Sequence, residues 1–341
     1  MASCISLTRK KLAAMMCLLS AALWNLMSVS HLFHDPSQAQ AHNRSLTVLI
    51  WGWPFGHAFN FTQDVCATLH GTTGCHLTWN RSLYNQSDVV VFHHWVLQHG
   101  GSSLPRSKLH PWQKWVWLSL ESPAHTKILA GWDGMFNWVM TYRRDSDIFL
   151  PYGELVPQPS GNVNIPEKTS LVSWVISNYY HTQERAHLVH DLSKHIKIDV
   201  YGKANRKPLC PACLLATISK YKFYLAFENS IYQDYITEKL WRNALLAGTV
   251  PVVMGPPRAN YQQFIPSEAF IHVDDFSSAK ELADFLATMN DSLYRRYFEW
   301  KRNYAVKLWD NWAERFCTIC QQYPSLPQGK VYPSVERWFQ A

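Results

Sequence analysis

Charged residues are scarce in this sequence. They make up 17% of its 341 residues, whereas hydrophobic residues make up 47%. A chain with this balance has enough apolar surface to bury, which excludes an intrinsically disordered protein. The sequence also lacks a dense run of lysine or arginine, and its formal net charge is only +7. These features argue against a nucleic-acid-binding protein, although the mild positive charge suits small anionic ligands such as a nucleotide diphosphate.

One segment near the N-terminus has no charged residue at all. Residues 12–33 contain no Asp, Glu, Lys or Arg, and they follow a basic tripeptide at 9–11. At about 1.5 Å per residue, a helix of this length just spans a bilayer. The apolar region of a cleaved signal peptide is usually shorter than this, which favours an uncleaved anchor over the alternative, a secretory signal peptide. We therefore expect a cytosolic tail at 1–11, a signal-anchor transmembrane helix at 12–33 and a lumenal stem at 34–45.

Glycosylation sequons and cysteines agree with a lumenal body. The N-x-S/T sequons begin at Asn43, Asn60, Asn80, Asn85 and Asn290. Beyond the expected anchor, the cysteines are Cys66, Cys75, Cys210, Cys213, Cys317 and Cys320. An even number of cysteines in an oxidising compartment predicts disulfides. The alternative for the two CxxC pairs is a zinc site, but no pattern of histidine ligands accompanies them.

Short, continuous apolar runs occur in both halves of the lumenal body and are typical of strands buried on both faces of a parallel sheet. In the first half, strands are expected at 46–51, 89–92, 115–120 and 136–141. In the second half, strands are expected at 171–176, 196–201, 223–227, 249–254 and 270–273, with helices at 184–195, 238–247 and 279–289. This rhythm predicts two doubly wound α/β units, and a Pro- and Gly-containing linker at 156–168 separates them.

Two such units place a ligand in the cleft between them, beyond the carboxyl ends of their strands. The helix expected after Thr237, a candidate N-cap, begins with Glu238 and Lys239. Free N–H groups at a helix N-terminus and a lysine bind phosphate, and a glutamate accepts hydrogen bonds from ribose hydroxyls. From the residues alone, an equally good interpretation is that Glu238 only stabilises the first turn of the helix and that Lys239 only faces solvent.

Several longer motifs are more specific. They are WGWPFG at 51–56, VVFHH at 90–94, SLESPAHT at 119–126, FNWVMTYRRDSDIFLPYG at 136–153, WVISN at 174–178, and FENS with DYITEK at 227–239. Together they resemble the α1,3-fucosyltransferases, glycosyltransferase family 10, whose members make Lewis-type antigens. Three further motifs resemble the leukocyte-type branch that makes sialyl Lewis x: RKPLCPACL at 206–214, HVDDFSSAKELADFL at 272–286 and the ending WFQA.

The resemblance implies a GT-B architecture, in which two Rossmann-like domains face a cleft. An acceptor-binding domain is expected at 46–155, a GDP-fucose-binding domain at 169–325, and a segment at 326–341 that returns toward the first domain. The implied reaction is inverting transfer of L-fucose from GDP-β-L-fucose to the 3-hydroxyl of GlcNAc in sialylated or unsialylated N-acetyllactosamine. One base on the acceptor hydroxyl and charge stabilisation of the leaving diphosphate suffice for it.

The resemblance also implies partners and a location. The partners are GDP-fucose and the lactosamine chains of glycoproteins and glycolipids, and no nucleic acid is expected. No cofactor is required, and a divalent cation is at most stimulatory. The expected location is the Golgi membrane, as a single-pass type II protein. One alternative is an α1,3/4-fucosyltransferase of broader acceptor range, and a non-enzymatic alternative is a lumenal glycan-binding protein.

Site residues follow from the matched motifs. Glu121 matches the catalytic base, and its position just past a buried strand is one where apolar walls raise a carboxyl pKa. The implied donor-binding residues are Tyr152, Ser177, Asn178, Arg185, Tyr224, Asn229, Tyr235, Glu238 and Lys239, of which Arg185 and Lys239 match the pyrophosphate-binding cations. The implied acceptor-binding residues are His57, His93, His94 and Trp95. Trp95 stands where leukocyte-type members have Arg, and His57 stands in place of a family Gln.

Two further features have competing interpretations. The triplet Asp145-Ser146-Asp147 resembles a DxD metal motif, but the family uses no such metal, so we expect an ion pair between Arg143 and Asp145 and no metal site. The six lumenal cysteines match family positions. Their pairing is either local, Cys66–Cys75 with Cys317–Cys320, or crossed, with Cys66 and Cys75 each bonded to the C-terminal pair, and in both cases Cys210 pairs with Cys213.

Overall fold

The computed structural model describes residues 45–56, 64–100, 104–126, 131–159 and 163–341. The predicted tail, the predicted anchor helix and nearly all of the stem lie outside these residues. Within the described ranges, no helix is both long and apolar enough to cross a membrane.

Six parallel strands form the first sheet, in the order β2-β1-β3-β4-β5-β6. They are β1 (Leu46–Ile50), β2 (Cys75–Thr78), β3 (Val89–His93), β4 (Lys114–Ser119), β5 (Trp138–Thr141) and β6 (Ile148–Phe149). Helices α3 (Val65–His70) and α4 (His94–His99) connect some of them. The central strands β3 and β4 are almost completely buried, which explains why their sequences are continuous apolar runs rather than alternating ones.

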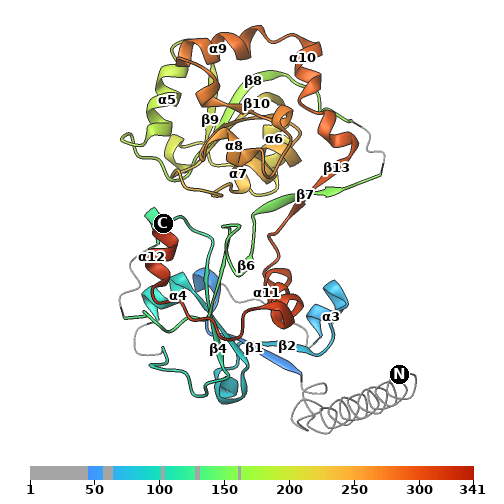
Figure 1. Cartoon of the computed structure of the whole chain (residues 1–341). Coiled ribbons are helices and arrows are strands. Elements are labelled where there is room, and N and C mark those ends of the chain that lie inside the picture. Colours follow the sequence, from blue (N-terminus) through green and yellow to red (C-terminus); the bar gives the residue numbers. More distant parts are fainter. Residues whose placement is uncertain (1–44, 57–63, 101–103, 127–130, 160–162) are drawn as a thin grey trace, which may run out of the picture. The chain divides into compact units, whose positions relative to one another are not determined.

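Five parallel strands form the second sheet, in the order β12-β11-β10-β8-β9. They are β8 (Ser170–Val175), β9 (Ile198–Tyr201), β10 (Tyr221–Phe227), β11 (Val250–Met254) and β12 (Ile271–His272). The order reverses direction between β8 and β10, and ligands of such sheets bind at this kind of switch point. Figure 1 shows this sheet with its helices, labelled α5 to α10.

Side chains of β10 alternate between the two faces of the second sheet. Phe223, Leu225 and Phe227 pack with α5 (Glu184–Leu192), α9 (Ala279–Thr288) and α10 (Asp291–Arg296). Tyr224 and Ala226 pack on the other face with α6 (Cys213–Ile218), α8 (Arg258–Tyr261) and the turns around α7 (Glu238–Leu240). Because both faces are covered, the prediction of a doubly wound α/β unit is confirmed for this sheet.

A two-stranded antiparallel ribbon lies outside both sheets. It pairs β7 (Gly153–Pro157) with β13 (Tyr304–Leu308), so the linker expected to begin at residue 156 starts within a strand. Gly153 is required here, because a Cβ atom on it would lie 2.6 Å from Cγ of Trp241.

The chain returns to the first sheet earlier than expected. The boundary was placed at residue 326, but α11 (Trp312–Gln322) already packs with the first sheet, as does α12 (Val335–Gln340). Phe316 and Ile319 of α11 are completely buried in that core, and Phe339 of α12 packs edge-on against Trp117 at 4.8 Å. Apolar residues of α11 are therefore part of the first core and not of the second domain.

Disulfides explain this early return. Cys66 bonds Cys317, and Cys75 bonds Cys320, which joins α3 and β2 to α11 across about 250 residues of sequence. The crossed pairing is therefore the one present, and Cys210–Cys213 is local. The sulfur atoms of Cys66, Cys75 and Cys320 lie within 4.8 Å of one another, but each is already in a disulfide, so none is a thiolate ligand for zinc.

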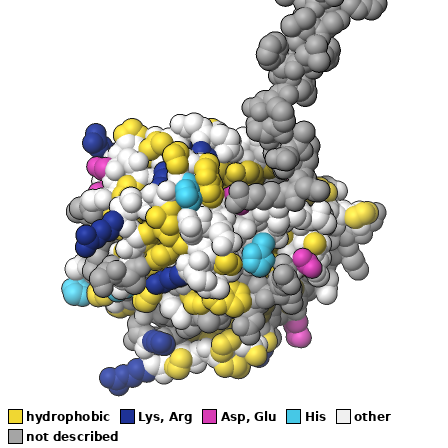
Figure 2. Space-filling model, turned by 90° about the horizontal axis from the view of Figure 1, so that it is seen from below, with side chains coloured by type: hydrophobic (Ala, Val, Ile, Leu, Met, Phe, Trp, Pro, Cys, Tyr) yellow, Lys and Arg dark blue, Asp and Glu magenta, His cyan; other side chains and the backbone are white. Residues whose placement is uncertain are grey.

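The surface carries dispersed positive charge and exposed sequons. On the face shown in Figure 2, described Lys and Arg side chains lie among hydrophobic and uncharged ones and do not gather into one patch. Asn80, Asn85 and Asn290 are exposed, as glycosylation requires, whereas Asn43 and Asn60 lie outside the described residues.

Candidate active site

A cavity of about 570 Å³ lies at the carboxyl ends of β8 and β9, next to the switch point of the second sheet. Most of the predicted donor-binding residues line it: Ser177, Asn178, Arg185, Asn229, Glu238 and Lys239. The lining also includes Lys203, Arg242 and Asn243, which the sequence did not single out. Gly202 allows a close turn at its edge, since its φ is 111° and an added Cβ would lie 1.9 Å from the carbonyl oxygen of Ile176.

Arg185 is the second residue of α5 and is only 4% exposed. Its Nη2 donates to the carbonyl oxygen of Asn178 at 2.5 Å, and its Nη1 donates to that of Phe227 at 3.3 Å. Its Nε donates to the side chain of Gln183 at 3.2 Å. Carbonyl dipoles orient this guanidinium without neutralising its charge, so the cation remains available to an anionic ligand in the cavity.

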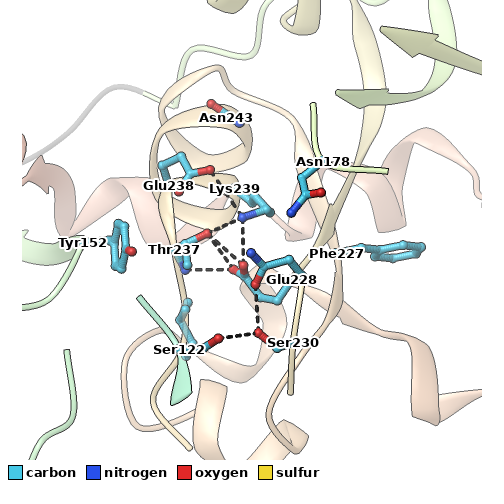
Figure 3. A network of polar contacts seen from close by, with 12 residues as sticks. Ser122, Tyr152, Asn178, Phe227, Glu228, Ser230, Thr237, Glu238, Lys239 and Asn243 are labelled. Carbon is cyan, nitrogen blue, oxygen red and sulfur yellow. Dashed lines mark hydrogen bonds and ion pairs between the residues drawn. The ribbon is translucent and has the colours of Figure 1, made fainter. Parts of the chain in front are cut away.

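Lys239 is held by a buried carboxylate that the sequence analysis did not identify. Glu228, at 4% exposed, follows β10 and accepts from the Lys239 ammonium at 3.0 Å (Figure 3). Glu228 also accepts from the backbone N–H and the hydroxyl of Thr237, both at 2.8 Å. Thr237 does occupy the N-cap position, but its hydroxyl bonds Glu228 instead of capping the helix. Only the position of Glu228 at the end of a buried strand signalled this role.

These contacts favour the charged form of the lysine. Burial alone would lower the pKa of Lys239, but Glu228 and Glu238 outweigh burial and raise it above its ordinary value. Burial raises the pKa of Glu228, and Lys239 opposes that rise. For Glu238, burial is opposed by Lys239, 3.3 Å away, and the pKa falls below its ordinary value. The cavity wall therefore presents an ammonium between two carboxylates.

The predicted base, Glu121, lies two residues beyond β4 and is partly buried. Burial raises the pKa of its carboxyl group above the ordinary value, and the nearby Glu238 raises it as well. His125, Lys239 and the Tyr235 side chain oppose that rise. The carboxyl group of Glu121 is therefore within electrostatic reach of two residues that line the cavity.

The loop between β10 and α7 connects this carboxylate to the cavity. Tyr235 of this loop is 2% exposed and packs in the core of the first sheet, where its ring centroid lies 5.0 Å from that of Tyr142. Ser230 of the same loop bonds Ser122, the neighbour of Glu121, at 2.7 Å. The loop thus brings side chains of the second half against the base and leads directly into Lys239.

Asp234 fastens the middle of this loop to both halves. Its carboxylate accepts from the backbone N–H of Arg144 at 2.9 Å and from the side chain of Asn260 at 2.7 Å. Its φ of 61° is uncommon for a residue other than glycine, and these bonds stabilise it. Asp234 opens the DYITEK motif, but the sequence did not indicate this role, because its partners are 90 and 26 residues away.

Three predicted donor-binding tyrosines do not line the cavity. Tyr224 is completely buried behind it, and its hydroxyl accepts from Asn243 at 3.2 Å. Tyr235 lies beside Glu121, as described above. Tyr152 also lies on that side, where its hydroxyl donates to the carbonyl oxygen of Leu120. These tyrosines follow the same motifs as the cavity residues, but burial directs them into the core.

The predicted acceptor residues lie at the switch point of the first sheet. His93 ends β3 and His94 begins α4, and the two imidazoles are 1% and 3% exposed. Burial lowers the pKa of His93 well below its ordinary value and that of His94 to about 4, so both are neutral near pH 7. Trp95 is partly buried and stacks on His99 at 4.5 Å. His57 lies outside the described residues.

The DxD-like triplet forms structural contacts. Arg143 forms the predicted ion pair with Asp145, through bonds of 2.9 and 2.8 Å. Asp147 is almost fully buried and accepts from Lys330 at 2.6 Å and from Tyr332 at 2.9 Å. Asp147 therefore binds the C-terminal segment to the first sheet, and Asp145 holds Arg143, which donates to the carbonyl oxygen of Trp338 at 2.8 Å.

Comparisons with known proteins agree with this arrangement. Residues 43–153 match the family model described as "Fucosyltransferase, N-terminal", and residues 165–338 match "Glycosyltransferase family 10 (fucosyltransferase) C-term". The chain is 50% identical to α-(1,3)-fucosyltransferase 7 of Homo sapiens, over 95% of this chain and 94% of that protein. It is 45% identical to 4-galactosyl-N-acetylglucosaminide 3-α-L-fucosyltransferase 9 of Mus musculus, over 86% of this chain and 82% of that protein.

The fold also has a solved counterpart. A crystal structure of an α1,3-fucosyltransferase with GDP-fucose matches with a TM-score of 0.57 at 17% identity, over 85% of this chain and 92% of that chain. A likeness at this identity speaks for the fold alone. Family models and close relatives together cover nearly all of the described residues. The chain is therefore a glycosyltransferase and belongs to glycosyltransferase family 10, the fucosyltransferases.

Proposed function

We propose that this protein transfers L-fucose from GDP-β-L-fucose to the 3-hydroxyl of GlcNAc in N-acetyllactosamine, with or without a terminal sialic acid, and inverts the anomeric centre. The names of its relatives support this donor class and linkage, since they are α-(1,3)-fucosyltransferases 7 and a 4-galactosyl-N-acetylglucosaminide 3-α-L-fucosyltransferase. The observation that carries the mechanism is the Glu121 carboxyl group within electrostatic reach of Lys239.

In this mechanism Glu121 removes the proton from the acceptor 3-hydroxyl while the oxygen attacks the anomeric carbon of fucose. The bond from that carbon to the diphosphate breaks on the opposite face, which inverts the configuration and releases GDP. The raised pKa of Glu121 makes its carboxylate a better base than an exposed glutamate. The Tyr235 side chain, which lowers the pKa of Glu121, is close enough to orient it.

The leaving diphosphate gains negative charge as the bond breaks. Arg185 and Lys239 line the cavity that receives the donor, and both are mostly buried, so their charges act in a medium of low dielectric constant. We infer that these two cations supply the stabilisation that a metal ion supplies in metal-dependent transferases. A divalent cation is then at most stimulatory.

The remaining elements of the proposal concern the acceptor and the compartment. His93, His94 and Trp95 bound the acceptor side at the end of β3, next to the strand that leads to Glu121. The charge-free segment at 12–33, the exposed sequons and the disulfides support a type II Golgi membrane protein with a lumenal body. Protection of the body from protease in intact Golgi vesicles tests that orientation.

A transfer assay tests the reaction. The full chain is incubated with GDP-fucose and either sialylated or neutral lactosamine, of type 1 or type 2, with and without EDTA, and the product is analysed by NMR. We expect an α1,3 linkage on type 2 chains and activity that survives EDTA. A product with fucose on the 4-hydroxyl of type 1 chains would favour the α1,3/4 alternative. Absence of transfer from GDP-fucose to every acceptor would refute the proposed function.

A further inference from the structure

Arg315 is a buried cation that the proposed mechanism does not use. It lies on α11, is 7% exposed, and its guanidinium carbon is 4.5 Å from the ring centroid of Trp312. Its Nε atom is buried without a hydrogen-bond partner. Across the described ranges no ion pair joins Arg315 to a carboxylate, and the neighbouring Glu314 pairs instead with Lys307 at 3.0 Å. Asp310 and Glu314 act on Arg315 electrostatically, but neither forms a hydrogen bond with it among the described residues. A buried N–H donor without an acceptor is costly, so a bound ligand that supplies an acceptor would stabilise this site.

A second unpartnered donor lies beside it. The backbone N–H of Trp95 donates to Nδ1 of His93 at 3.2 Å, so the neutral imidazole carries its proton on Nε2. That Nε2 atom is buried and has no hydrogen-bond partner. The His93 ring lies 5.8 Å from the ring of Trp312, the same indole on which Arg315 packs. Two N–H donors around one aromatic ring therefore lack an acceptor, and oxygen atoms of an anion would satisfy both.

Strand register places these donors on the acceptor side of the site. His93 pairs with Leu118 in the parallel ladder of β3 and β4, three residues before Glu121. Tyr152, whose hydroxyl bonds the residue before Glu121, is within electrostatic reach of both Glu121 and Arg315. Phe55 is 44% exposed and packs at 4.9 Å on the His93 ring, so an exposed aromatic side chain lies next to these donors.

We propose that Arg315, together with His93, binds the carboxylate of a sialic acid on the acceptor glycan. The two oxygen atoms of a carboxylate match the planar fork of a guanidinium, and the bond is strong where water is excluded. The inference rests on the proposed function, because it assigns a substrate group to that site. A sulfate ester on a lactosamine chain has similar chemistry, and the test separates it from a carboxylate.

The test measures fucose transfer by the full chain to sialylated, sulfated and neutral lactosamine. The variants are Arg315→Met, Arg315→Lys and, as matched control, Arg337→Met, which removes an exposed arginine on α12. For Arg315→Met we expect kcat/KM with the sialylated acceptor to fall by about 10- to 100-fold relative to the neutral one, the usual scale of a hydrogen bond to a charged group. Arg315→Lys should retain part of the preference, and Arg337→Met all of it.

Donor KM and the melting temperature of each variant separate a binding effect from misfolding. If the neutral acceptor is not used at all, the ratio of kcat/KM values cannot be formed. The KM for the sialylated acceptor is then compared with the KM for GDP-fucose in the same variant. An unchanged ratio in Arg315→Met, or an equal loss with all three acceptors, would overturn the assignment while leaving fucose transfer intact. A larger loss with the sulfated than with the sialylated acceptor would also overturn it. Failure of the unsubstituted chain to transfer fucose would instead refute the proposed function.

Discussion

The donor side and the acceptor side of the active site differ in how their buried polar groups are satisfied. On the donor side, Lys239 donates to Glu228, Glu238 and Thr237, and Arg185 donates to three oxygen atoms of neighbouring residues. On the acceptor side, Nε2 of His93, Nδ1 of His94 and Nε of Arg315 are buried and have no hydrogen-bond partner in the part of the chain that the structure describes.

This difference indicates how each substrate is recognised. Preformed bonds hold the donor-side cations in place before any ligand arrives, which limits the reorganisation needed for catalysis. The acceptor side leaves buried nitrogen atoms unsatisfied within the described residues, and under the proposal above a hydroxyl or carboxylate of the glycan would supply the missing bonds. Such a site discriminates strongly against an acceptor without the matching group, because the buried donors then stay unpaired.

The largest effect is expected between the two sides, at Glu121. Glu121→Gln should lower kcat by at least about 100-fold, because an amide cannot take the proton from the acceptor hydroxyl. Binding of GDP, measured by calorimetry, should remain within about threefold, since the base does not line the donor cavity. Near-normal turnover in this variant would remove Glu121 from the role of base.

Removing Glu228 should break the donor-side network. Glu228→Ala leaves the buried Lys239 without its closest carboxylate, and we expect the free energy of unfolding to fall by about 3 kcal/mol. Urea unfolding measures the change, with Glu268→Ala, which removes an exposed carboxylate, as control. Equal stability of the two variants would contradict a structural pairing of Glu228 with Lys239.

The acceptor side should be sensitive to acid. The folded pKa of His94 is about 4, below its ordinary value of 6.5, so the unfolded chain binds this proton more tightly. Stability from this group is complete above pH 6.5 and is lost as the pH falls toward 4, by about 2–3 kcal/mol at pH 4.5. In the His94→Gln variant, the free energy of unfolding should fall less between pH 6.5 and pH 4.5, as measured by urea unfolding at several pH values. As a control, His190→Gln, at an exposed histidine, should leave the fall in stability with acid unchanged.

Lys239→Ala should weaken donor binding before it affects acceptor binding. Loss of a charged contact to the diphosphate is expected to raise the KM for GDP-fucose by about 30-fold, with a smaller change in acceptor KM. Lys280→Ala, at an exposed lysine on α9, provides the control. An unchanged donor KM would count against Lys239 as a phosphate ligand.

Motif residues at strand ends were predictable from the sequence because parallel strands place their carboxyl ends at one edge. Ser177 and Asn178, which follow β8, line the cavity for this reason, whereas Lys239 lines it from α7. Tyr224 and Tyr235 follow the same motifs but face the core, since the alternation of a strand and the path of a loop decide which way a side chain points. Glu228 was missed because its partners, Thr237 and Lys239, meet it only when the intervening loop folds back.

By itself, the sequence determined the two α/β units, the family and the candidate base, because continuous apolar runs and long motifs are local properties of the chain. Only the tertiary structure decided the crossed disulfides, the early return of α11, and the position of Arg315 beside His93. Each of these joins residues more than 200 positions apart. Local pattern does not encode such contacts, because they depend on how the chain folds back onto the first sheet after it has completed the second.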